Sequence, residues 1–157
     1  MKVLAIDPGY GRCGIAVVEK ENGKEILIYS SCVETPATSE FPERLAIVAD
    51  ECARLLREYK PGALVLEKLY ITKNQKTAMR VAEVRGALIS AAARAGVPIS
   101  EYTPSEVKAA VTGNGRADKH AVTKILHALV KIEKEIKHDD EYDAIAIAVT
   151  HLARVRH

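Results

Sequence analysis

Four acidic residues stand where strands end or a helix begins, and their side chains suit metal-dependent chemistry. Asp7 follows the apolar run VLAI, Glu67 follows ALVL, and Asp140 and Asp143 precede the apolar run AIAIAV. Carboxylates within about 4–6 Å of one another raise each other's pKa, so a group of them needs a cation. Oxygen ligands favour Mg²⁺ or Mn²⁺, and two such ions about 3.5–4 Å apart can activate water and stabilise a leaving oxygen. The four acids therefore indicate metal-assisted hydrolysis of a phosphodiester.

Each acid also has a structural interpretation. Asp7 stands before Pro8-Gly9 and could be a turn residue, Asp140 could cap a helix, and the helix dipole could favour Asp143. Glu67 is harder to explain in this way, because a carboxylate that closes a buried strand loses its hydration unless a partner replaces it.

The elements that must position these acids alternate in type along the chain. Five runs have strand-like apolar patterns: residues 2–6, 13–19, 25–33, 63–67 and 97–102. Five have helical periodicity or caps: residues 45–60, 74–95, 103–113, 118–130 and 141–154. Short turns join the first three strands as antiparallel neighbours, whereas strand-helix-strand crossovers favour parallel pairing. We therefore predict an α/β fold, a five-stranded mixed sheet with helices on both faces.

The first and fourth strands are expected to be parallel neighbours. Their last residues, Asp7 and Glu67, then meet at one edge of the sheet, about 5 Å apart in the pairing direction. Asp140 and Asp143 are three residues apart and share one face of the last helix, whose apolar residues pack on the sheet. All four carboxylates can therefore converge.

Composition is that of a folded chain with a single domain, residues 1–157. The net charge is only +2, but residues 103–137 carry seven basic side chains against four acidic ones, a modest excess that suits phosphate contacts. No apolar run approaches the roughly 20 residues that cross a bilayer, and a cytoplasmic location is expected. Cys13, Cys32 and Cys52 lack CxxC spacing and are predicted to be buried free thiols, and no His/Cys cluster suggests zinc.

Five segments in order carry a family resemblance. They are IDPGYGRCG at 6–14, VLEKLYITKN at 65–74, EVRG at 83–86, VKAAVTGNGRADK at 107–119 and DAIAIAVTH at 143–151. Together they resemble the RuvC family of Holliday-junction resolvases, which has the ribonuclease H-like fold. The resemblance implies a homodimer that binds a four-way DNA junction and makes paired, symmetrical nicks in recombination and repair. It also implies two Mg²⁺ ions per site, with Mn²⁺ possible, and branch-migration motor proteins as partners.

The same resemblance assigns roles to individual residues. The family's metal-binding acids fall on Asp7, Glu67, Asp140 and Asp143, although His138 and Asp139 just before Asp140 leave the third of these open. The active-site lysines fall on Lys108 and Lys119, which from the residues alone would be surface lysines. An aromatic residue that helps to open base pairs falls on Tyr70. Weaker candidates for phosphate contacts are Lys73, Lys76, Arg80 and Arg116.

The same residues are compatible with three other functions. An exonuclease or an RNA/DNA-hybrid nuclease of the same fold would use similar acids. A junction-binding protein without catalysis would not need them. A kinase or ATPase of the actin-like fold also ends its first strand with an acid and a glycine turn, but it needs two such domains.

Overall fold

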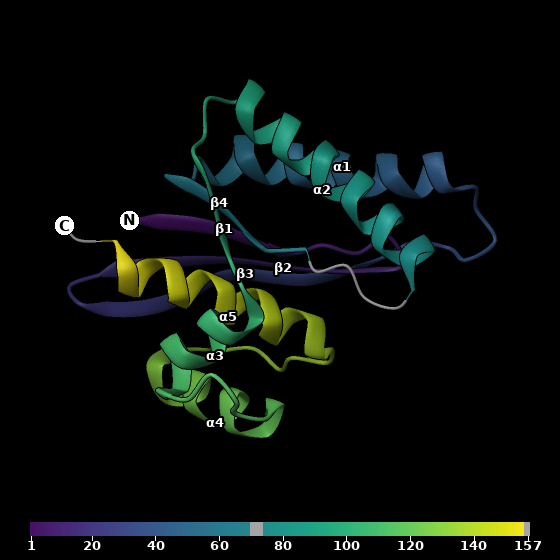
Figure 1. Cartoon of the computed structure of the whole chain (residues 1–157). Helices are drawn as coiled ribbons and strands as arrows, with labels where there is room; N and C mark the ends of the chain where they lie inside the picture. Colours follow the sequence, from purple (N-terminus) through teal and green to yellow (C-terminus); the bar gives the residue numbers. More distant parts are fainter. Residues whose placement is uncertain (70–73, 156–157) are drawn as a thin grey trace.

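The computed structural model describes residues 1–69 and 74–155, which form a sheet covered by helices on both faces (Figure 1). The strands are β1 (Lys2–Asp7), β2 (Arg12–Glu21), β3 (Lys24–Glu34), β4 (Ala63–Glu67), β5 (Ile99–Tyr102) and β6 (Val130–Lys131). The helices are α1 (Phe41–Tyr59), α2 (Gln75–Arg94), α3 (Pro104–Thr112), α4 (Lys119–Leu129) and α5 (Asp139–Arg154).

The sheet is mixed, with the strand order β5-β4-β1-β2-β3-β6. Strand β1 is antiparallel to β2 and parallel to β4, as predicted, and β2 is antiparallel to β3. The prediction of five strands was wrong by one: β6 has two residues, and it pairs with β3 at Glu25 and Ile26. So short a strand carries no alternating pattern, and only its position beside β3 defines it.

Alternate residues of the central strands face two separate cores. Leu4 and Ile6 of β1 pack beneath α1 and α2, in a cluster with Leu55 and Leu88. Val3 and Ala5 point to the opposite face, where they pack with the apolar residues of α5. Both faces of β1 and β4 are buried, which explains why each strand reads as a continuous apolar run.

Local signals in the sequence explain where several elements end. Asn22 and Gly23 form the β2–β3 turn with φ of 50° and 78°, the backbone that a tight two-residue hairpin requires. Helix α1 ends at Lys60, which adopts the left-handed conformation (φ 45°) before Pro61. Thr103 and Glu106 form the predicted capping box at the start of α3.

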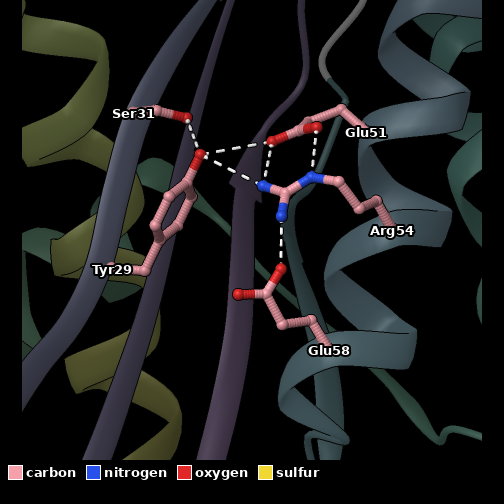
Figure 2. A network of polar contacts seen from close by, with 5 residues as sticks. All are labelled: Tyr29, Ser31, Glu51, Arg54 and Glu58. Atoms are coloured by element: carbon pink, nitrogen blue, oxygen red, sulfur yellow. Dashed lines mark hydrogen bonds and ion pairs between the residues drawn. The ribbon is translucent and has the colours of Figure 1, made fainter.

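A polar network fastens α1 to the sheet (Figure 2). The Tyr29 hydroxyl on β3 donates to Glu51 on α1 (3.2 Å) and lies 3.1 Å from the Ser31 hydroxyl. Arg54 pairs with Glu51 (2.7 Å) and with Glu58 on the same helix face. Its hydrogen bond lowers the pKa of the Glu51 carboxyl.

Across residues 1–69 and 74–155, no helix combines the length and the apolar character needed to cross a membrane.

Candidate active site

Asp7 and Glu67 lie at the same edge of the sheet, as predicted. Strands β1 and β4 pair in parallel up to Ile6 and Leu66, and each acid is the next and last residue of its strand. Arg85 of α2 stabilises the C-terminal end of β4, because it donates a hydrogen bond to the Glu67 backbone carbonyl and pairs with Glu101 of β5 at 2.9 Å. Sheet pairing therefore brings together two carboxylates that are 60 positions apart in the sequence.

Helix α5 reaches this edge because β2 has a glycine there. Gly14 is the partner of Asp7 in the β1–β2 register. A Cβ atom on Gly14 would lie 1.9 Å from the backbone oxygen of Asp140, so any other residue would push the start of α5 away from the sheet. Glycine at this position therefore allows the helix to set its first turn beside Asp7.

The start of α5 corrects one sequence interpretation. The helix begins at Asp139, two residues earlier than predicted, and its N-cap is His138. Asp140 is thus inside the first turn rather than at the cap. The early start could not be seen in the apolar periodicity, which begins only at Ala144.

The electrostatics of the site show a cluster of carboxylates that repel one another. Burial, followed by the charges of Asp143, Glu67 and Asp140, raises the pKa of Asp7 to about 8. Burial and Asp143 raise the pKa of Glu67, and burial raises that of Asp143, with Lys119 opposing the rise. The basic side chains around Asp7 do not offset this repulsion, so the site favours a bound cation.

A cleft of about 260 Å³ opens over the acids and is bordered by two lysines. Asp7, Glu67 and Asp143 line it, together with Lys108 of α3 and Lys119 of α4. The Lys119 amino group lies 3.7 Å from the Asp143 carboxylate, and the charge of Lys108 lowers the pKa of Glu67. The two lysines therefore border the same cleft as the carboxylates.

The two candidates for the fourth acid occupy different positions. Asp139 lines the cleft, whereas Asp140 does not. The charge of Asp140 nevertheless raises the pKa of both Asp7 and Asp143, and the Asp140 carboxylate lies 3.9 Å from the Cys32 sulfur on β3. Both acids of the first α5 turn therefore act on the cluster, since Asp139 also raises the pKa of Asp143.

Of the other predicted residues that the structure describes, Lys76, Arg80 and Arg116 do not line this cleft. Lys76 and Arg80 are on α2, where the Arg80 guanidinium stacks on the Phe41 ring at 4.0 Å and pairs with Glu83. Arg116 lies in the loop before α4. Tyr70 and Lys73 lie outside the described residues, so their predicted roles remain predictions.

Sequence reasoning missed two features of the site. The first is Arg85, which is only 8% exposed and contacts the C-terminal end of β4. The sequence signal that could have identified it is a basic residue between the buried positions Val84 and Leu88. The cysteine prediction was wrong for one residue: Cys13 and Cys52 are buried, but Cys32 is partly exposed. Within residues 1–69 and 74–155, β6 pairs with β3 only at Glu25 and Ile26, at the opposite end of β3 from Cys32.

Comparisons with known proteins agree with this geometry. The family described as crossover junction endodeoxyribonuclease RuvC matches residues 3–151. A relative with that name in Brachyspira hyodysenteriae is 39% identical over 99% of this chain and 96% of its own length. Another, in Petrotoga mobilis, is 42% identical over 96% of this chain and 93% of its own length.

Among solved structures, Thermus thermophilus RuvC in complex with a Holliday junction substrate superposes with a TM-score of 0.91. The two are 30% identical in sequence, and the match covers 97% of this chain and 93% of that chain. The ribonuclease H-like fold predicted from the sequence is thereby confirmed. The matches in sequence and in structure both extend over nearly the whole chain, and this protein belongs to the RuvC family of crossover junction endodeoxyribonucleases.

Proposed function

We propose that this protein cuts four-way DNA junctions at the crossover by metal-dependent hydrolysis, with Asp7, Glu67, Asp140 and Asp143 as its metal ligands. The observation that carries the proposal is that Asp7, Glu67 and Asp143 line one cleft bordered by Lys108 and Lys119, with Asp140 near enough for its charge to raise the pKa of Asp7. Membership of the RuvC family and the similarity to a relative solved with a Holliday junction support the choice of substrate.

The donor set fits Mg²⁺ or Mn²⁺. Nucleases of this family are metal-dependent, and a site built from carboxylate oxygens is the type that such hard cations prefer. Asp7, Glu67 and Asp143 would hold one ion, and Asp140 would contribute to a second. When bound, the ions would supply Lewis acidity and lower the pKa of a coordinated water.

Lys108 and Lys119 are proposed to neutralise the phosphate at the cut. Both side chains border the cleft from helices on the same face of the sheet as α5, and Lys119 already faces the Asp143 carboxylate. A fixed positive charge stabilises the negative charge that develops on the phosphate oxygens in the transition state. The amino groups would therefore contribute to rate more than to folding.

Binding of the whole junction would draw on a wider surface. Lys76, Arg80 and Arg116, and Lys73 outside the described residues, are candidates for phosphate contacts, and Tyr70 is the candidate for opening base pairs. Two copies related by a two-fold axis would match the two-fold symmetry of a junction and give paired nicks. The motor proteins implied by the resemblance, and a location in the cytoplasm, belong to this proposal too.

The test is cleavage of a synthetic junction with a mobile core in the presence of Mg²⁺, beside linear duplex and RNA/DNA hybrid. We expect symmetrical nicks confined to the junction, no cleavage by Asp7→Asn, and junction binding retained by that variant. Asp50→Asn, which changes an exposed acid on α1, is the matched control and should cut normally. Cleavage of the hybrid with an intact junction would overturn the proposal in favour of another nuclease of the same fold.

A further inference from the structure

Three potential metal ligands of different chemistry lie together beside the acidic site. They are Cys32 and Glu34, at the end of β3, and His138, the residue before α5. One ligand atom from each residue lies within 4.8 Å of the other two. The His138 Nε2 atom is 3.1 Å from the Glu34 carboxylate, and both side chains are partly open to solvent.

The spacing of these atoms is close to that of a tetrahedral metal site. Bonds of about 2.0–2.3 Å to nitrogen, oxygen and sulfur place neighbouring ligand atoms roughly 3.3–3.8 Å apart. Separations of up to 4.8 Å would have to contract by up to about 1.3 Å to reach that scale, and the Glu34 and His138 side chains, which are partly open to solvent, can rotate to supply it.

The ligand types select a different metal from the one that the four acids suit. A thiolate and an imidazole favour zinc and related transition metals, whereas carboxylates alone favour Mg²⁺ or Mn²⁺. We propose that Cys32, Glu34 and His138 form a second metal site, specific for Zn²⁺-class ions, next to the acidic site. Binding forms a bond from sulfur to the metal and releases the Cys32 thiol proton to solvent.

A nearby ion pair and the protonation of Cys32 both affect the occupancy of this site. Arg12 approaches the Glu34 carboxylate only to 4.0 Å, and both side chains are more than half exposed, so this ion pair competes weakly. Burial and the nearby carboxylates raise the pKa of the Cys32 thiol to about 11, so a metal must displace its proton at neutral pH.

Asp140 links this second site to the acidic site. Its carboxylate lies 3.9 Å from the Cys32 sulfur and is a candidate for a fourth ligand. A Zn²⁺ ion bound by Cys32, Glu34 and His138 would draw Asp140 away from Asp7 and slow cleavage. This consequence rests on the proposed function, whereas metal binding itself does not.

Cobalt(II) titration of the whole protein, without DNA or Mg²⁺, tests binding directly, because thiolate ligation gives a charge-transfer band. We expect the wild type to show a band that saturates at one equivalent of cobalt and disappears when Zn²⁺ is added. The Cys32→Ser variant should lack the band, and the Cys52→Ala variant should retain it. His138→Gln should weaken cobalt affinity at least tenfold, as expected for the loss of one ligand. Absence of the band in the wild type, or its survival in Cys32→Ser, would overturn the proposed site.

Cleavage then tests the link to Asp140. Zn²⁺ added to the Mg²⁺-dependent reaction should slow cleavage by the wild type. At the same Zn²⁺ concentrations, the Cys32→Ser variant should cut as fast as it does without Zn²⁺. Equal inhibition of both proteins would refute the link and assign the inhibition to the four acids. If neither protein cuts any junction, the proposed function fails, but the cobalt band still decides the metal site.

Discussion

Replacing Asp7 with asparagine should stabilise the metal-free protein, because Asp7 in the folded chain carries a charge that its surroundings disfavour. The pKa of Asp7 rises from 3.8 to about 8, through burial and then through Asp143, Glu67 and Asp140. A raised carboxyl pKa gives stability that is fully present below pH 4 and is lost as pH rises toward 8. Asparagine has no charge to lose, and its amide can donate to Asp143 as protonated Asp7 does.

The size of the effect follows from the shift. Each pKa unit corresponds to about 1.4 kcal/mol, so the wild type should lose about 2.5 kcal/mol relative to Asp7→Asn between pH 4 and 6. The loss should reach a ceiling of about 5–6 kcal/mol above pH 8, since the whole shift of roughly four units has then been titrated.

Urea unfolding of both proteins in EDTA, at intervals from pH 4 to 9, measures this difference. The gap should widen with pH and then shrink or reverse when Mg²⁺ is added, because the ion stabilises the folded wild type by mass action. If Asp7→Asn is less stable at every pH in EDTA, Asp7 is a structural turn residue, and the account of the cluster is wrong.

Three further predictions concern how the site is positioned. Gly14→Ala should lower the melting temperature and reduce cleavage at least 100-fold, because the added Cβ atom meets the Asp140 backbone. The control Gly86→Ala places its Cβ atom in open space on α2 and should be neutral or stabilise the protein by about 1 kcal/mol. Lys134→Ala should cost about 2 kcal/mol in urea unfolding, because the buried Glu141 loses its 2.9 Å partner. Lys119→Ala should lower kcat about 10- to 100-fold with little change in junction affinity or stability, since its ion pair with Asp143 is exposed.

Much of the fold could be predicted because its signals are local. The apolar runs ending at Asp7 and Glu67 located β1 and β4 to within one residue, and the Thr103 capping box located α3. The errors occurred where local signals were weak. Strand β6 is too short to show a period, and the acidic first turn of α5 lacks the apolar residues that would mark it as helix.

The sequence by itself determined which residues are available for chemistry and, by strand order, that Asp7 and Glu67 share an edge. Only the tertiary structure decided how near α5 comes to that edge, through Gly14, and that Asp139 lines the cleft whereas the charge of Asp140 raises the pKa of Asp7. It also decided that Cys32, Glu34 and His138 meet. The physical reason is that periodicity and capping depend on neighbours in sequence, whereas these contacts join residues that lie about 100 positions or more apart and meet only when the sheet and α5 pack together.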